Sequence, residues 1–263
     1  AKMAFTEQIV DSATASLENL SNSGKDNMTW YDAPMEQPFF HVRSIDSKVS
    51  ITPGSTVVMG GLITEARKAM DDKIPFKYGP DDHREAKRRN KLALQHALGL
   101  EENPDAPLFF WPSRLDPVQK GPQLLADITY RFLDKYHADG AQIAVIANGP
   151  FQQPFWDIQN FHGIHKRLAV HNFDGRLSQL GFAASDFTLM PSLFEPCGLP
   201  QMQAPIYGSL AVAHNTGGLH DTVEPLDWGA SRGNGFRFDT YDSGGLFWAM
   251  VQAMAFYHQP TDV

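Results

Sequence analysis

Little cysteine, no excess of positive charge and no long apolar run mark this sequence, and each absence excludes a class of protein. The 263 residues contain one cysteine, Cys197, which excludes an internal disulfide and favours a reducing, cytoplasmic location. The net charge of −8 argues against a nucleic-acid or anionic-membrane partner, so an anionic substrate would have to be met by a few local cations. No segment has transmembrane length, and the start AKMAFTEQIVDS lacks a signal-peptide pattern. The ten histidines show no metal-ligand spacing, so neither a metal nor a cofactor is expected.

Short apolar strands alternate with helices over residues 77–258. Strands are expected at 107–111, 141–148, 167–170, 186–190, 209–214 and 235–238. Helices are expected at 82–98, 121–136, 154–161, 174–185, 198–208 and 244–257, with one more opening at the Gly217-Gly218 turn. This alternation predicts an α/β fold with a doubly wound parallel sheet. Ligands of such sheets bind beyond the carboxyl ends of the strands.

Three loops at such strand ends carry chemical groups. The first, SRLDPVQKG at 113–121, holds Arg114 and Lys120, a planar fork and a compact point charge that suit one diphosphate. The second places Glu195 at a Pro-Cys-Gly turn that opens a helix, and the third, twenty-one residues later, is a Thr-Gly-Gly turn. Two helix N-termini close together suit a sugar and a phosphate. The plainer alternatives are a solvated Arg and Lys and an acidic helix cap.

In this order the three loops resemble the nucleotide-sugar half of bacterial glycogen synthases and plant starch synthases, over about 77–258. The resemblance implies the C-terminal, Rossmann-like half of a two-domain GT-B glycosyltransferase. It also implies retaining transfer of glucose from ADP-glucose to an α-1,4-glucan acceptor. In that family, Arg114 and Lys120 would contact the diphosphate, and Glu195 would stabilise the transition state beside the donor glucose.

Further roles follow from the same resemblance. Backbone amides would serve the sugar at Cys197, Gly198 and Leu199 and the distal phosphate at Thr216, Gly217 and Gly218. Phe173 falls where the family presents a tyrosine that stacks on the nucleotide base. A phenyl ring retains stacking but not the hydroxyl, which leaves the base preference open, and an ordinary apolar helix-start residue is the alternative. Cys197 as a nucleophile is disfavoured, because no histidine lies nearby in sequence and a small packed residue explains it.

Residues 1–76 do not share the alternating pattern. The run 39–51 has period-two alternation, Pro53-Gly54 is a turn signal, and 55–66 is a second strand, which together predict a β-hairpin. Residues of about 35–76 resemble a segment of the outer-membrane secretins, with a generic amphipathic hairpin as the alternative. We therefore expect a join near Phe76–Lys77, between an N-terminal segment at 1–76 and a nucleotide-sugar-binding domain at 77–263.

Three functions remain open on the sequence. The first is the donor-binding half of an α-glucan synthase, expected to be inactive by itself because the acceptor half of the family has no counterpart here. The second is a module that binds ADP or a sugar nucleotide without transfer. The third is a secretin-related fusion that carries the other domain as a passenger. The three ordered motifs favour the first.

Overall fold

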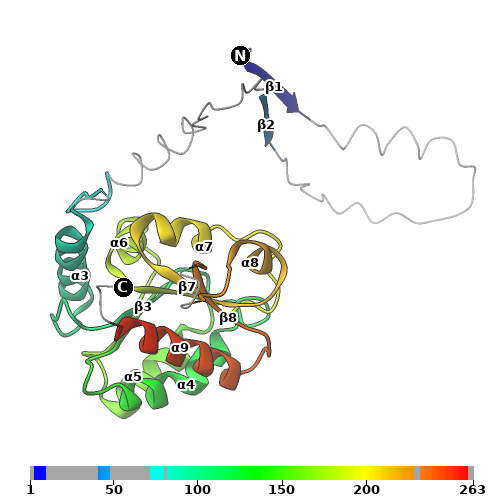
Figure 1. The fold of residues 1–263 in the computed structure, drawn as a ribbon. Coiled ribbons are helices and arrows are strands. Elements are labelled where there is room, and N and C mark those ends of the chain that lie inside the picture. The colour runs from blue at the N-terminus through cyan, green and yellow to red at the C-terminus, as the bar shows by residue number, and fades with distance from the viewer. Residues whose placement is uncertain (1–2, 10–40, 48–71, 80–81, 228–231, 260–263) are drawn as a thin grey trace, which may run out of the picture. The chain divides into compact units, whose positions relative to one another are not determined.

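The computed structural model describes residues 3–9, 41–47, 72–79, 82–227 and 232–259, and the chain divides into two units, 1–60 and 61–263 (Figure 1). In the first unit, β1 (Met3–Ile9) pairs antiparallel with β2 (His41–Ser47), with Met3 opposite Ser47. The strand predicted at 39–51 is confirmed over His41–Ser47, but its partner is β1. The other predicted strand, 55–66, and the turn before it lie outside the described residues.

The second unit is built on a six-stranded parallel sheet in the order β5-β4-β3-β6-β7-β8. Its strands are β3 (Leu108–Trp111), β4 (Gln142–Ile146), β5 (Leu168–His171), β6 (Phe187–Met190), β7 (Leu210–His214) and β8 (Gly235–Phe238). Its helices are α3 (His83–Leu98), α4 (Pro122–Lys135), α5 (Gln152–His162), α6 (Gly175–Ala184), α7 (Pro200–Gln203), the 3-10 helix η1 (Ala204–Tyr207), α8 (Gly217–Thr222) and α9 (Ser243–Tyr257). The predicted α/β class and parallel sheet are confirmed.

Both faces of this sheet are buried, which explains why the strands are apolar without alternation. On β3, Phe109 and Trp111 pack into the core beneath α4, α5 and α9, while Leu108 and Phe110 pack into a second core on the α3 and α6 side. Phe109 stacks on Phe187 of β6 with ring centroids 4.8 Å apart. The result is a three-layer sandwich, in which α7 packs on β6 and β7 and α8 packs on β7.

Helix ends follow the local sequence closely. Gly99 ends α3 in the left-handed conformation at φ 70°, as predicted. The helix predicted at 198–208 is wrong as one element, because it consists of the single turn α7 followed by η1. Pro205 has no amide hydrogen to continue the α-helical ladder, so the chain tightens into a 3-10 turn at that point.

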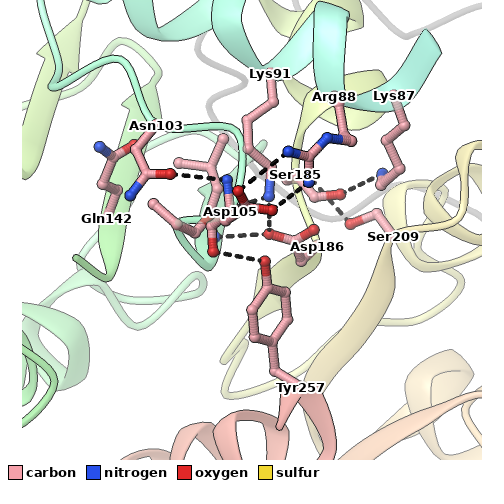
Figure 2. A network of polar contacts seen from close by, with 12 residues as sticks. Lys87, Arg88, Lys91, Asn103, Asp105, Gln142, Ser185, Asp186, Ser209 and Tyr257 are labelled. Carbon is pink, nitrogen blue, oxygen red and sulfur yellow. Dashed lines mark hydrogen bonds and ion pairs between the residues drawn. The ribbon is translucent and has the colours of Figure 1, made fainter. Parts of the chain in front are cut away.

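Polar contacts attach α3 to the amino ends of the strands (Figure 2). Lys91 Nζ lies 2.7 Å from Asp186 Oδ2, and the same oxygen accepts a 2.8 Å hydrogen bond from the Leu108 amide. Lys87 Nζ donates to three carbonyl oxygens, among them that of Ser185 at 2.6 Å. This network lies at the amino ends of the strands, whereas the three predicted loops follow their carboxyl ends.

Residues 72–79, which precede α3, belong to the second unit and pack against its core. Ile74 is 5% exposed and belongs to the core on the α3 side. Phe76 exchanges two hydrogen bonds with the Asn90 side chain, at 3.2 and 2.7 Å, and its ring lies 3.9 Å from the Arg89 guanidinium carbon. No helix among the described residues has both the length and the apolarity that crossing a membrane requires.

Candidate functional site

The strand order reverses between β3 and β6, and the loops that hold Arg114, Lys120 and Glu195 leave the sheet there. From β3 the chain continues outward to β4 and β5 on one side, while β6 begins the series on the other. In doubly wound sheets, ligands bind at this point, beyond the carboxyl ends of the strands. The loop 112–121 follows β3, and the loop 191–199 follows β6. The fold thus places two of the three predicted loops side by side at this point.

The β3–α4 loop is shaped by the side chain of Asp116. Its Oδ1 accepts hydrogen bonds from the amides of Val118 at 2.9 Å and Gln119 at 3.0 Å, and these bonds lower the pKa of the carboxyl group. The Lys120 amide closes the turn on the Asp116 carbonyl at 3.0 Å. Arg114 stays 70% exposed, with one guanidinium nitrogen 3.8 Å from Asp116 Oδ2. The loop therefore holds its backbone fixed while it leaves the arginine in solvent.

Direct contacts join this loop to the β6–α7 loop. The Leu193 amide donates to the Gln119 carbonyl at 2.8 Å, and Gln119 Nε2 donates to the Phe194 carbonyl at 3.4 Å. Gly121, at φ 69°, passes so close to the Pro191 carbonyl that a Cβ would overlap its oxygen. Sequence reasoning missed this glycine, although its place just before Pro122 at the start of a helix was a usable signal.

Lys120 and Glu195 form an ion pair across these two loops. The lysine side chain is 13% exposed and the glutamate side chain 9%. Ser192 Oγ donates to the same carboxylate oxygen, Oε2, at 3.2 Å, and the Ser192 carbonyl in turn lies 2.8 Å from His214 Nδ1. The family resemblance implied separate roles for Lys120 and Glu195, and neither their pairing nor the contact with Ser192 was predicted. Such a nearly buried pair holds the carboxylate in one orientation.

The third loop packs directly on the second. The Gly218 amide donates to the Glu195 carbonyl at 2.8 Å. A Cβ on Gly217 would overlap that carbonyl oxygen, and a Cβ on Gly218 would overlap the carbonyl of Cys197. Gln201 adds a further tie, because its Nε2 donates to the Cys197 carbonyl at 3.0 Å and to Thr222 Oγ1 at 3.1 Å. The two glycines are therefore required for contact between the turns.

The backbone amides of the two turns differ in availability. Within the described residues the amides of 197–199 have no acceptor, so all three can donate to a ligand. In the other turn, the Thr216 amide donates to the His214 carbonyl at 2.9 Å and the Gly218 amide to Glu195, which leaves the Gly217 amide without an acceptor in the described part of the chain. The Cys197 thiol is exposed, so the expectation of a packed cysteine is wrong.

A pocket of about 770 Å³ adjoins the β3–α4 loop and the loop after β4. Arg114 and Phe173 both line this pocket, and Phe173 is 58% exposed. The Phe173 amide donates to Asn148 Oδ1 at 2.9 Å, and a Cβ on Gly149, at φ 147°, would lie 2.6 Å from the Leu115 carbonyl oxygen. Sequence reasoning missed Asn148 and Gly149, although a polar residue and a glycine directly after a buried strand are typical of a ligand-binding loop.

The predicted residues thus fall into two adjoining groups. Lys120, Glu195 and the turn at 216–218 are joined by the contacts above, whereas Arg114 and Phe173 line the pocket. The two cations have different ion-pair partners, Asp116 for Arg114 and Glu195 for Lys120. Among the described residues, no three His, Cys, Asp or Glu side chains gather in a way that could hold a metal ion.

Curated relatives match about three quarters of this chain. The glycogen synthase of Exiguobacterium sibiricum is 39% identical over 189 residues, which are 72% of this chain and 38% of the relative. The glycogen synthase of Streptococcus gordonii is 36% identical over 218 residues, 81% of this chain and 44% of the relative. The chain therefore spans about two fifths of the length of these relatives. No protein-family model matches the sequence.

Solved structures give the same grouping. The catalytic domain of starch synthase IV from Arabidopsis thaliana, bound to ADP and acarbose, superposes with a TM-score of 0.64 at 33% identity, over 73% of this chain and 39% of that one. The C-terminal domain of a group 1 glycosyl transferase, LpcC from Francisella tularensis, shares the fold with a TM-score of 0.50 at 17% identity, over 63% of this chain and 82% of that domain. In sequence and in fold, over the part that matches, this chain belongs to the glycogen and starch synthase family of GT-B glycosyltransferases.

Proposed function

We propose that the second unit binds ADP-glucose and forms the donor side of a retaining α-1,4-glucan glucosyltransferase. The observation that carries this proposal is the convergence of three loops at the carboxyl edge of the sheet, where Lys120 pairs with Glu195 and the Gly218 amide donates to the Glu195 carbonyl. Names of relatives that act as glycogen synthases, and the ADP in the starch synthase structure, support the choice of donor.

The pocket beside Arg114 suits the nucleotide part of this donor. Its volume of about 770 Å³ falls in the usual range for a small-molecule site, roughly 300–1,000 Å³. Phe173 offers an exposed ring face for a base, and Arg114 offers a fork of donors for phosphate oxygens. Among the described residues, the carboxylate nearest to the exposed guanidinium is that of Asp116, at 3.8 Å, so a ligand has no shorter ion pair to displace.

The reacting end of the donor would lie beside Glu195. When the bond from glucose to diphosphate breaks, negative charge grows on the leaving phosphate and positive charge on the sugar. Lys120 and the Gly217 amide would stabilise the phosphate, and the Glu195 carboxylate would stabilise the sugar. The amides of 197–199 would hold the sugar hydroxyls, because they have no acceptor within the described chain. In this proposal Lys120 gives up part of its contact with Glu195 when phosphate arrives.

Titration calorimetry with ADP tests the binding part of this proposal. A charge-assisted hydrogen bond contributes roughly 1.5–3 kcal/mol, so Arg114→Ala should raise the Kd for ADP about tenfold or more. Lys120→Ala should act in the same direction. Arg84→Ala, an exposed arginine on α3, is the matched control and should bind ADP as the parent chain does. Unchanged affinity in both site variants would remove the diphosphate assignment.

Transfer is a separate question with a separate assay. Positioning donor and acceptor on opposite walls of a cleft lowers a barrier by about 7–11 kcal/mol. The 263 residues span about two fifths of the relatives' length and are proposed to form the donor side. By themselves they should therefore bind ADP-glucose but incorporate no labelled glucose into glycogen. Incorporation that disappears in Glu195→Ala would show that residues 1–76 contribute to the acceptor side, which this proposal does not assign to them. ADP binding without incorporation, by contrast, leaves the donor-site assignment intact.

A further inference from the structure

A second hollow also lies beyond the carboxyl ends of the strands, beside β8. It measures about 480 Å³ and is formed by the end of β8, the connection 239–242 and the first turn and a half of α9. Since β8 is the edge strand of the sheet, this hollow is separated from the pocket at β3 and β4 by two further strands, β6 and β7. Arg114 and Phe173 do not line it, and none of the residues assigned to the donor site does.

One wall of this hollow is an exposed tryptophan. Trp248 of α9 is 55% exposed, while Leu246, Ala249 and Met250 around it are fully buried. The indole is therefore a flat apolar face presented to solvent on a helix that is fixed by its packing. Aromatic faces of this kind stack on the apolar C–H face of a pyranose ring while its hydroxyls stay at the rim.

Polar side chains are fixed around that face. Asp239 Oδ1 accepts a 2.6 Å hydrogen bond from Asn215 Nδ2, and Asp242 Oδ1 accepts one of 2.6 Å from the Gly245 amide. Within the described residues, the second oxygen of each carboxylate has no hydrogen-bond partner. The Arg237 guanidinium donates to the carbonyls of His220 and Val223 at 3.0 and 3.2 Å, so it too is held in place. Two acceptors and one donor thus border the hollow in set positions.

The floor of the hollow is open because it is built from glycine. A Cβ on Gly245 would overlap the Thr240 carbonyl oxygen, and one on Gly244 would lie 3.3 Å from Asp242 Oδ1. Both glycines line the hollow, and neither has a side chain that would fill it. Backbone stays close to the hollow, and a ligand can reach both the carboxylates and the indole face.

The charges select the kind of ligand. Two carboxylates against one guanidinium repel phosphates and other anions, which separates this hollow from a nucleotide site. Hydroxyl groups, in contrast, donate to carboxylates and accept from arginine, and the apolar indole face excludes a purely ionic ligand. We propose that this hollow binds a neutral carbohydrate chain of a few sugar units. That the chain is an α-glucan rests on the proposed function; that the hollow binds carbohydrate does not.

Electrophoresis of the full chain through gels that contain glycogen tests this proposal. The parent protein should be retarded relative to a gel without glycogen, and Trp248→Ala should lose the retardation. By titration, the Kd for maltoheptaose should rise about tenfold in Trp248→Ala, equivalent to about 1.4 kcal/mol. Trp248→Phe keeps a ring face and should retain most of the affinity. Phe161→Ala, which removes an aromatic side chain that is 85% exposed on α5, is the matched control and should behave as the parent chain.

Two outcomes would overturn the proposal. One is full retardation of a Trp248→Ala protein; the other is equal loss in Trp248→Ala and Phe161→Ala, which would mean nonspecific adhesion of aromatic side chains. ADP titration of Trp248→Ala serves as the check on folding and on the donor site, because unchanged ADP affinity shows that the loss concerns carbohydrate alone. If ADP fails to bind the parent protein while glycogen still retards it, the donor proposal fails and this one stands.

Discussion

Breaking the Lys120–Glu195 pair from one side should destabilise the second unit far more than breaking an exposed pair. Lys120→Met keeps the length and apolar stem of the lysine, and Glu195→Gln keeps the shape of the glutamate. Each single change leaves one charge in a place where the wild-type side chains are 13% and 9% exposed. The double variant removes both charges together.

The expected magnitudes follow from burial. Each side chain keeps about a tenth of its surface exposed, so we expect each single change to cost about 1–1.5 kcal/mol of unfolding free energy, less than the roughly 3–5 kcal/mol of a fully buried pair, whereas joint replacement of the pair is often close to neutral. We therefore expect a coupling energy of about 2–3 kcal/mol from the double-mutant cycle. The matched control is the Lys77–Asp72 pair, of the same chemical type but with side chains 61% and 63% exposed. Its cycle should give about 1 kcal/mol or less.

Urea unfolding, followed by circular dichroism, supplies the four free energies of each cycle. Added salt at about 1 M should reduce the coupling in the exposed pair and leave that of the buried pair nearly unchanged, because screening acts on solvated charges. A buried-pair coupling below about 0.5 kcal/mol, equal to that of the control, would refute the reasoning. It would mean that the Glu195 carboxylate is solvated and that Lys120 does not hold it in position.

Three further predictions concern packing, protonation and the domain boundary, each measured by unfolding free energy. Gly218→Ala should cost about 2 kcal/mol or more, because its Cβ overlaps a carbonyl, while Gly175→Ala at an open helix start should be neutral or stabilising by about 0.5 kcal/mol; equal effects would contradict the packing. Burial lowers the pKa of Lys87 from 10.5 to about 8, so between those pH values the unfolded chain binds more protons than the folded chain. The stability of the parent chain relative to Lys87→Met should therefore rise with pH across that window, by at most about 3 kcal/mol. A difference that does not change with pH would refute this prediction. A chain of 72–263 should be about 2 kcal/mol more stable than one that starts five residues later, because the later start removes the buried Ile74; equal stabilities would favour the later boundary.

Local pattern was sufficient to predict the sheet of the second unit and most of its helices. Continuous apolar runs such as 107–111 predict strands buried on both faces, and the structure packs neighbours on that strand into opposite cores. The end of α3 at Gly99 was predictable for the same local reason. The single helix expected at 198–208 failed because a weak periodicity was given more weight than Pro205, whose missing amide is a stronger constraint.

Partnerships between distant residues were not predictable in the same way. The sequence places Lys120 and Glu195 seventy-five residues apart, and nothing local says that a lysine from one loop will neutralise a carboxylate from another. Likewise β2 was predictable as a strand, but its pairing with β1 depends on which other segment offers a free edge. Strand pairing and ion pairing are both set by tertiary packing, which no single-sequence periodicity encodes.

The glycines of the third loop show how a motif can be required for a reason other than its supposed ligand. Gly217 and Gly218 were predicted as phosphate contacts, yet in the structure each is needed because a Cβ would overlap the backbone of the Glu195–Cys197 turn. The Gly218 amide is already committed to the Glu195 carbonyl. The Thr-Gly-Gly turn would therefore be needed to assemble this site even in a relative that binds no phosphate. The Arg114 guanidinium and the amides of 197–199 and Gly217 remain available to a ligand. Changes to these groups can therefore weaken binding without changing the stability of the fold.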